Sequence, residues 1–365
     1  MLRLSLSRVL LTTYLRVGQS ETLMSLECWS LTDPRWLRFI FGHAEATAFH
    51  HPSWASLLAE CYGYRAFAVA LTDDTGQIVA GLPVVEVRGP LGGRRWVSLP
   101  FTDHCAPLMS TGVDLGTLTD ALTRQPRNGI GRVEVHSALP ESPQVYPHSN
   151  AVMHTLPLSS DPDAVFRKFK RTQVQQSIVK SQRDGVTIRQ GESVADMRRF
   201  YSLQLQTRRR LGTPVQPWRF FRLLWERLLE PGQGFLLLAY HDRVPIAGAI
   251  FLAWNGTVIY KHSASAPVYW RLRPNNLVLW TAIKWGCENG YHTFDFGRTD
   301  LDDEGLRNFK NGWGAREEPL VYSVIADRPP RPSNGRLSPW MSAVIRHSPP
   351  VVCQVLGELF YRYAA

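Results

Sequence analysis

Two segments of the sequence carry the same short pattern in the same surroundings. Residues 77–87 read QIVAGLPVVEV, residues 244–254 read VPIAGAIFLAW, and the two align through Ala80-Gly81 and Ala247-Gly248. Each segment follows an apolar strand that ends in an acidic turn, and each precedes a further strand, a helix and another strand. The order β-β-β-α-β is therefore present twice, which predicts an internal duplication and two similar domains.

Periodicity and end signals predict the other elements. Asp33-Pro34 marks the start of a first helix, and the Pro-, Ser- and His-rich stretch 140–157 is typical of a linker. After it we expect a basic helix over 163–183, a helix over 193–212 opened by a serine cap, and a helix over 275–290.

The length of 365 residues agrees with two domains at about 150 residues each. We expect an extension over 1–24, an N-terminal domain over 25–150, a C-terminal domain with the active cleft over 151–328, and a helical tail over 329–365. The extension is either a basic amphipathic surface helix or a stretch that precedes a natural start at Met24.

Composition excludes several classes of protein. A hydrophobic content of 44% is too high for a disordered chain. The five cysteines are scattered and never form a C-x-x-C pair, which argues against a thiolate metal site and for a reducing compartment. No apolar run approaches the roughly 20 residues needed to span a bilayer, so we expect a cytoplasmic protein without a metal.

Positive charge is concentrated in one part of the chain. Between Phe166 and Arg222 there are 14 cations and three anions, whereas the net charge of the whole chain is +10. Such a region either attracts a polyanion or an anionic membrane face, or is a solvated helical face. The motifs of metalloproteases (H-E-x-x-H), serine hydrolases (G-x-S-x-G), P-loop ATPases and dinucleotide enzymes are absent from the sequence.

Four strings together resemble one family. They are AFHHPSW at 48–54, GRRWVSLPFTDHCAPL at 93–108, TRRRLGTPVQP at 207–217 and FDFGRTDLDDEGLRNFKNGWGA at 294–315. The chain is similar over 31–326 to the FemAB/FemX-like tandem GNAT-fold acyltransferases, in particular to FemAB-like proteins found beside exopolysaccharide and protein-sorting gene clusters.

The resemblance implies an α+β fold of two tandem GNAT-like domains, each a mixed sheet flanked by helices. It also implies an enzyme that transfers an acyl or aminoacyl group to an amine, here of a cell-envelope or exopolysaccharide precursor. The alternative is a non-catalytic polyanion-binding or scaffolding protein that retains the fold.

The donor loop departs from the acetyltransferase pattern. GNAT acetyltransferases usually carry a glycine-rich loop that holds the pyrophosphate of coenzyme A, but the corresponding loop, 265–276, reads SAPVYWRLRPNN and contains no glycine. Pro267 and Pro274 also lack an N–H donor. Acetyl-coenzyme A is therefore expected to bind weakly, and an aminoacyl-tRNA is the alternative donor to an acyl-CoA. The expected partners are a nucleotide- or lipid-linked glycan, tRNA as donor, and the inner membrane face, without stable DNA binding.

Asp295 is the first candidate catalytic residue. In the strand Phe294-Asp295-Phe296, alternation puts both aromatic rings on one face and the carboxylate on the other. At a splayed strand end this carboxylate could accept the proton of an attacking amine. The alternative is a structural aspartate that pairs with Arg298 or caps a helix.

Lys310 is the second candidate, with Arg298 beside it as a substrate-binding residue. Lys310 lies in NFKNGWG, where the resemblance implies a lysine near phosphate and acceptor. We expect both cations to face a cleft, with little effect of Lys310 on stability; the alternative is a surface ion pair with Asp302 or Asp303.

Six further residues are candidates for substrate binding. Tyr260, Lys261 and His262 lie on the strand before the donor loop, with Tyr260 and His262 expected on one face. His262 is either a base or a structural histidine. Asn275 is expected to cap the following helix, whose N-terminus attracts anions. Arg209 and Arg210 either reach the acceptor or form a solvated helix end.

Overall fold

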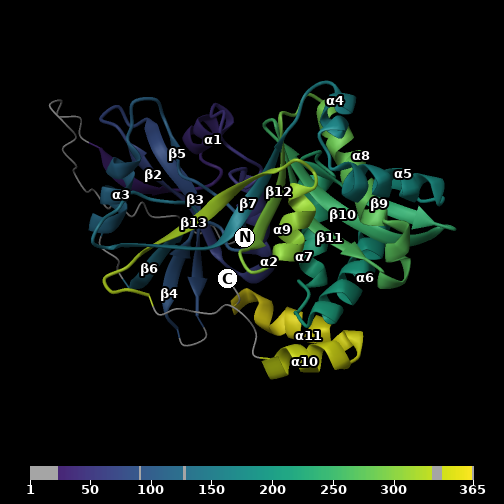
Figure 1. The fold of residues 1–365 in the computed structure, drawn as a ribbon. Helices are drawn as coiled ribbons and strands as arrows, with labels where there is room; N and C mark the ends of the chain where they lie inside the picture. The colour runs from purple at the N-terminus through teal and green to yellow at the C-terminus, as the bar shows by residue number, and fades with distance from the viewer. Residues whose placement is uncertain (1–23, 90–91, 126–128, 331–338, 364–365) are drawn as a thin grey trace. The chain divides into compact units, whose positions relative to one another are not determined.

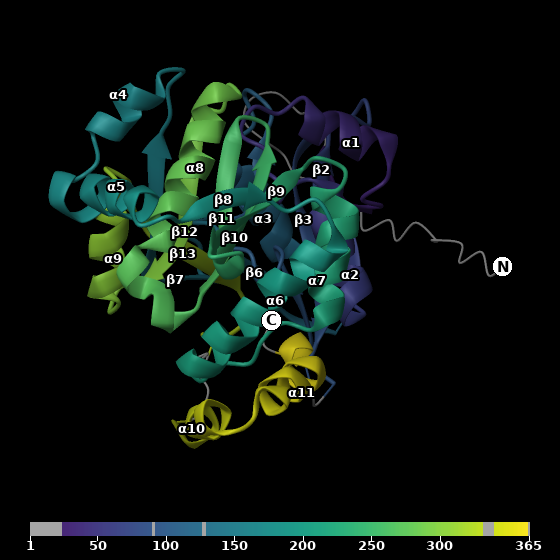
Figure 2. The ribbon, with the colours of Figure 1, turned by 90° about the vertical axis from the view of Figure 1, so that its right-hand side faces the viewer.

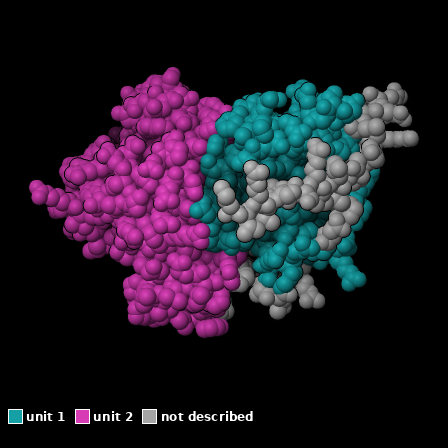
Figure 3. All heavy atoms as spheres, turned by 180° about the vertical axis from the view of Figure 1, so that it is seen from behind, with its two compact units in different colours: residues 1–149, 321–332 teal, residues 150–320, 333–365 magenta. Residues whose placement is uncertain are grey.

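The computed structural model describes residues 24–89, 92–125, 129–330 and 339–363 (Figure 1). The expected extension therefore lies, except for Met24, outside the described residues. The chain divides into two compact units, coloured separately in Figure 3: unit 1 comprises Met1–Ser149 and Val321–Pro332, and unit 2 comprises Asn150–Leu320 and Ser333–Ala365. The expected boundary at 150 lies at this division, whereas 321–332 fall in unit 1 and the rest of the expected tail, 333–365, falls in unit 2.

Unit 1 is built on a mixed sheet. Its strands, in sheet order, are β1 (Ser25–Trp29), β2 (Arg65–Thr72), β3 (Ile78–Arg88), β4 (Arg94–Val97), β6 (Ile130–Val135) and the end of β13 (Arg316–Ile325), with β5 (Leu108–Met109) paired to β3. The pair β4–β6 is parallel and the others are antiparallel. Helix α3 (Leu115–Arg124) joins the core on one face. Helices α1 (Pro34–Phe41) and α2 (Pro52–Tyr62) pack on β3.

Unit 2 repeats this plan with longer strands. Its sheet order is β7 (Val145–Pro157), β12 (Thr293–Asp300), β11 (Thr257–Ser265), β10 (Val244–Trp254), β9 (Gly234–His241) and β8 (Thr187–Gln190), of which β7 begins in unit 1. Here β11–β12 is the parallel pair. Asn255 and Gly256 have φ angles of 47° and 78°, and they form the tight turn between β10 and β11.

Helices cover both faces of the unit 2 sheet (Figure 2). Helices α4 (Pro162–Arg167), α5 (Gln176–Arg183) and α8 (Pro274–Glu288) enclose the larger core, which includes Phe251 and Phe294. On the other face lie α6 (Val194–Leu211) and α7 (Trp218–Leu224), and the remaining helices are α9 (Glu304–Asn311), α10 (Pro339–His347) and α11 (Pro350–Phe360). Short π-helical turns at Arg171–Gln175 and Trp225–Leu229, and 3₁₀ turns at Pro267–Leu272 and Tyr361–Tyr363, complete the fold.

The repeated Ala-Gly pair has the same packing role in both units. A Cβ on Gly81 would lie 3.0 Å from the ring of Trp36 in α1, and a Cβ on Gly248 would lie 3.1 Å from the ring of Phe200 in α6. In each unit the first helix of the pair therefore packs an aromatic ring onto the second strand of the hairpin, where only glycine leaves room. The predicted duplication is confirmed by this contact and by the matching strand orders.

Two sequence predictions of secondary structure are wrong. The expected linker 140–157 contains the strand β7, whose residues from Ala151 to Pro157 pair with β12. Long-range pairing there outweighs the loop-like composition. The expected basic helix over 163–183 is interrupted: α4 ends at Arg167, and Lys170, with a ψ of 117°, precedes a π-helical turn. In the described part of the chain, no helix combines the length and the apolar character needed to cross a membrane.

Candidate active site

The parallel ladder between β11 and β12 ends in the middle of both strands. Thr257, Val258 and Ile259 pair with Thr293, Phe294 and Asp295, and the ladder stops there although β11 continues to Ser265 and β12 to Asp300. Beyond the ladder the two strands no longer share hydrogen bonds. In this part of the sheet, backbone groups on the facing edges of β11 and β12 are not paired with each other.

Asp295 occupies the last paired position of β12. Phe294 and Phe296 are both buried in the core, and Asp295 is half-buried on the other face, so the predicted alternation is confirmed. One carboxylate oxygen accepts a hydrogen bond from the N–H of Gly297 at 2.7 Å. Gly297 has a φ of 72°, a conformation that favours glycine, and the backbone at this point fixes the direction of the carboxylate.

A β-bulge follows Asp295. In the antiparallel pair with β7, Asp295 faces Thr155 and Arg298 faces Met153, so Phe296 and Gly297 together lie opposite the single residue His154. The extra residue turns the strand and leaves backbone groups unpaired in the ladder.

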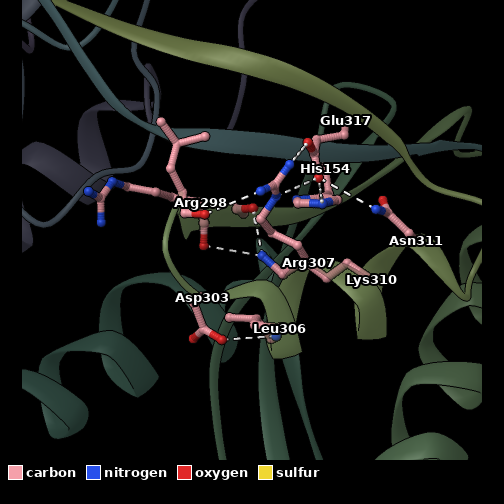
Figure 4. Close-up of polar contacts among 10 residues, drawn as sticks. His154, Arg298, Asp303, Leu306, Arg307, Lys310, Asn311 and Glu317 are labelled. Carbon is pink, nitrogen blue, oxygen red and sulfur yellow. Dashed lines mark hydrogen bonds and ion pairs between the residues drawn. The ribbon is translucent and has the colours of Figure 1, made fainter.

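Lys310 supplies the missing donor at the bulge. Its Nζ donates to the carbonyl oxygens of Gly297 at 2.8 Å and Arg298 at 3.2 Å, and only 3% of the residue is exposed (Figure 4). Lys310 thus lies against the backbone instead of facing a cleft as expected, and this burial argues against the expectation that it has little effect on stability. Lys310 holds the same glycine whose N–H holds Asp295, so it positions the candidate carboxylate.

Arg298 is near Lys310 only through its backbone. Its guanidinium is bound to Asp300 at 2.7 Å and to the side chain of Asn150 at 3.0 Å, and it points away from Lys310 (Figure 4). The expected pair of cations converging on one phosphate is not formed. Asp303, a partner considered for Lys310, accepts from the N–H of Leu306 at 3.0 Å and caps α9.

A cluster of polar side chains beside the bulge, of which His154 is fully buried, was not predicted from the sequence. Glu317 accepts two hydrogen bonds from Arg307, at 2.7 and 3.1 Å, and lies 3.1 Å from Nε2 of His154 and 3.5 Å from Nδ2 of Asn311 (Figure 4). We call these four residues the Glu317 cluster. The spacing of Arg307 and Asn311 on one face of α9 was a signal for it, but His154 lies 163 residues from Glu317 in the sequence.

Electrostatics keeps the Glu317 cluster in one protonation state. Hydrogen bonds from Arg307 lower the pKa of Glu317 to about 2. Burial, together with the nearby cation Lys310, lowers the pKa of His154. A neutral histidine and an ionised glutamate thus join β7 and β13 to α9, which carries Lys310.

A pocket of about 440 Å³ lies at the end of β11, between the C-terminus of α6 and the N-terminus of α8. Its polar lining includes Arg210, Ser265, Arg273, Asn275 and Asn276. Asn275 and Trp270 both donate to the hydroxyl of Ser265, at 3.3 and 3.0 Å. Asn276 is only 7% exposed, and its side chain has no hydrogen-bond partner among the described residues. A side-chain amide that lines a pocket and has no hydrogen-bond partner among the described residues is suited to bind a polar ligand.

The donor loop folds as a 3₁₀ helix over Pro267–Leu272. Its N–H groups are used internally, since Tyr269 donates to the carbonyl of Ala266 and Arg273 to that of Trp270. Pro274 occupies the first position of α8 and Arg273, with a φ of 55°, is the cap, so the prediction that Asn275 caps the helix is wrong. These residues do not fit the glycine-loop mode of coenzyme A binding, because few backbone donors are left for a pyrophosphate.

A second bulge changes the expected faces on β11. Ile250 pairs with His262 and Phe251 with Tyr260, so Lys261 is the extra residue. Tyr260 consequently packs on the core and stacks on Phe251, whereas His262 packs against Phe221 of α7 on the opposite face. The expectation that Tyr260 and His262 share a face is wrong, because a bulge reverses the alternation.

Burial shifts the pKa values of Tyr260 and His262 away from neutral pH, which makes proton transfer by either side chain less favourable. It raises the pKa of Tyr260 to about 12 and lowers the pKa of His262 well below its ordinary value, the latter with help from Lys261 and Arg208. His262 is thus neutral, which agrees with a structural histidine more than with a base.

The two arginines at the end of α6 have different surroundings. Arg209 donates from Nε to the carbonyl of Ser348 at 2.7 Å and so ties α6 to the segment between α10 and α11. Arg210 is exposed, lies 4.8 Å from the ring of Trp270 and lines the pocket. Of the sequence candidates, the pocket thus brings together Arg210 and Asn275, while Asp295 and Lys310 meet at the bulge.

Part of unit 2 matches a known protein family. Residues 168–311, within unit 2, match the family model described as acetyltransferase (GNAT) domain. This segment contains α6, β9–β11, α8 and β12, which carry the open ladder, the pocket and Asp295. None of the curated proteins matches the sequence.

Solved structures extend the likeness to both units. A crystal structure of FemX is similar with a TM-score of 0.65 and 14% identity, over 81% of this chain and 96% of that one. A tandem GNAT protein from the clavulanic acid biosynthesis pathway gives a TM-score of 0.50 at 10% identity, over 84% and 100%. The C-terminal domain of a putative lysylphosphatidylglycerol synthetase from Agrobacterium fabrum gives 0.50 at 14%, over 75% and 87%.

These likenesses establish the fold. The chain is an α+β protein with a FemX-like tandem GNAT fold, as the sequence predicted. The association with particular gene clusters stays a prediction.

Proposed function

We propose that unit 2 transfers an activated acyl or aminoacyl group to an amine of a cell-envelope or exopolysaccharide precursor. The observation that carries this proposal is the ladder between β11 and β12, which opens at Asp295 in the same unit as a polar pocket at the end of β11. The GNAT family match over the same residues supports acyl transfer as the reaction type.

The pocket is suited to the donor. An activated acyl group carries a phosphorylated leaving group, and the pocket has two cations, Arg210 and Arg273, beside the N-terminus of α8. Asn276 offers an amide that has no hydrogen-bond partner in the part of the chain that the structure describes. Because the 3₁₀ loop uses its own N–H groups, side chains rather than backbone would bind the phosphate, which favours a large donor such as an aminoacyl-tRNA over acetyl-coenzyme A.

Asp295 is the proposed proton acceptor. The amine nitrogen forms a bond to the donor carbonyl carbon, and the amine proton passes to the Asp295 carboxylate. The bond from that carbon to the leaving oxygen or sulfur breaks, and the leaving atom takes up a proton from solvent, so that the products are an amide and an alcohol or thiol. Gly297 orients this carboxylate and Lys310 holds Gly297, so Lys310 acts as a positioning residue.

A transfer assay tests the proposal. Ligands that co-purify with the full chain are identified by mass spectrometry, and labelled aminoacyl-tRNA and acyl-CoA are then offered with amine acceptors of the identified class. We expect Asp295→Asn to lower turnover by roughly 10²–10⁴-fold, because the amide cannot accept the proton. Asp242→Asn, an exposed aspartate in the β9–β10 turn, is the matched control. Unchanged turnover in Asp295→Asn would show that Asp295 is not the proton acceptor.

A non-catalytic polyanion-binding protein is the second candidate. The 14 cations between Phe166 and Arg222 favour it. Tight binding of tRNA without transfer to any acceptor would support this function instead of the first.

A further inference from the structure

The C-terminal helices α10 and α11 are fixed to unit 2 by one face. Ile345 and Cys353 are fully buried, and the thiol of Cys353 donates to the carbonyl of Thr213 at 3.4 Å. Arg209 of α6 binds the carbonyl of Ser348 between the two helices, and a Cβ on Gly357 would overlap the carbonyl oxygen of Val215. Both helices pack on α6, as Figures 1 and 2 show (yellow). This face is a built interface rather than a loose tail.

The opposite face of the same helices is apolar and exposed. On α11, Val351, Val355 and Leu359 follow at spacings of four residues, with exposed fractions of 58%, 47% and 55%. On α10, Trp340 and Val344 repeat this spacing with 67% and 43%, and Phe360 adds 56% at the end of α11. A surface helix normally turns its apolar stripe inward, so two adjacent outward stripes indicate an interaction surface.

The charges around this surface are mainly positive. Residues 339–362 contain a single carboxylate, Glu358, and its side chain accepts from the N–H of Trp218 at 3.3 Å. Arg362 is exposed just beyond the end of α11, and Arg219, next to Trp218, is exposed on α7. Arg346 instead donates to the carbonyl of Leu211 at 3.5 Å, on the side of α6. An apolar face with a tryptophan, bordered by arginines, has the composition of a helix that lies in a membrane interface.

We propose that the outer face of α10 and α11 docks onto the surface of an anionic lipid bilayer, with the helices parallel to the membrane plane. The valine, leucine and aromatic side chains would enter the boundary between headgroups and acyl chains, and the arginines would contact lipid phosphates. The helices lie on the membrane and do not cross it, since no helix of the described residues is long and apolar enough. The inference is independent of the transferase proposal.

Vesicle co-sedimentation with the full chain tests this docking. One set of vesicles contains phosphatidylcholine alone and the other contains about one third phosphatidylglycerol. We expect binding to the anionic vesicles that weakens as salt rises, and little binding to the neutral ones. Absence of binding to anionic vesicles at low salt would overturn the proposal.

The double variant Val351→Asp with Val355→Asp addresses the surface itself. Both side chains point outward, so the inner contacts of α11 stay intact, and we expect binding at least about tenfold weaker through lost apolar burial and added negative charge. Val179→Asp, an equally exposed valine on α5 (56%), should bind like the parent chain. Thermal unfolding checks that each variant folds.

Two results of the variant experiment would contradict the proposal. If the double variant binds anionic vesicles as tightly as the parent chain, α11 is not the docking face. If it binds the same but changes the oligomeric state in light scattering, the face joins two copies of the chain.

Discussion

The side chain of Lys310 shows how burial changes the role expected of a charged residue. The sequence places a lysine in NFKNGWG and predicts a cation that faces a ligand cleft, yet its ammonium group is buried against two backbone carbonyls at the β12 bulge. Nothing in the local sequence of α9 could predict this contact, because the bulge arises from the register between β12 and β7. Burial of Lys310 depends on a strand pairing across more than 140 residues of sequence.

Replacement of Lys310 should therefore cost stability. We expect Lys310→Met, which keeps the apolar stem, to lower the free energy of unfolding by about 1–3 kcal/mol, because two buried carbonyl groups lose their charged donor. Lys284→Met is the control, since Lys284 is exposed on α8 and its ion pair with Glu288 contributes about 0–1 kcal/mol. Urea unfolding measures both. Equal stability of the Lys310 variant and the parent chain would show that the buried contact does not contribute to the free energy of unfolding.

Among the elements, α9 and the β7 and β13 strands are joined by the Glu317 cluster, and this makes stability depend on pH. The pKa of Glu317 is lowered to about 2 from an ordinary value of 4.5. A carboxylate with a lowered pKa in the folded state stabilises the fold above its unfolded pKa and loses this contribution as pH falls towards the folded pKa. The lowered pKa of His154 acts in the same direction, starting below pH 6.5, because the unfolded chain takes up the proton first.

The variant Glu317→Gln isolates the glutamate from the other acids of the chain. We expect it to be less stable than the parent near neutral pH, and the difference in unfolding free energy should shrink as pH falls from 4.5 to about 2. Glu288→Gln on the surface of α8 should give no such trend. A difference that stays constant across this range would mean that Arg307 does not stabilise the ionised form.

The donor loop between β11 and α8 makes a prediction about the cofactor. Because the 3₁₀ helix uses its N–H groups internally and Pro274 begins α8, we expect acetyl-coenzyme A to bind weakly or not at all. Isothermal calorimetry measures this, with an established GNAT acetyltransferase as the positive control. Stoichiometric binding with a micromolar dissociation constant would contradict it.

Local signals predicted most elements, and long-range pairing decided the others. The cap at Asp33, the turn at Asn255-Gly256 and the helix end at Gly212 form as expected, because each depends on neighbours in the sequence. Residues 140–157 were misread because their partner strand β12 lies far along the chain. The bulge at Lys261 likewise has no signal in the neighbouring sequence, and it places His262 on the face of the sheet opposite Tyr260. In the candidate site, Asp295 was predictable from alternation and the Glu317 cluster was not.

At the scale of the whole molecule, the two units share a plan but differ where the parallel ladder ends. In unit 1, Ser98 donates its N–H to the carbonyl of Glu134, and its hydroxyl accepts from the N–H of His136. Cys105 adds a bond to the carbonyl of His136, so the segment after β4 closes the end of this ladder. In unit 2 the corresponding ladder stays open at Asp295. This contrast is the reason why the proposed reaction is assigned to unit 2.

The contacts of β1 predict where the folded part of the chain begins. Met24 packs against the core of unit 1, and all five residues of β1 pair with β2. A chain that starts at Met24 keeps these contacts, and we expect its melting temperature to lie within about 2 °C of that of the full chain. A chain that starts at Ser30 loses the buried Leu26 and Trp29 and should melt roughly 10 °C or more lower. Differential scanning calorimetry compares the three. A large drop for the Met24 chain would show that residues 1–23 stabilise the fold, and an unchanged Ser30 chain would show that β1 is dispensable.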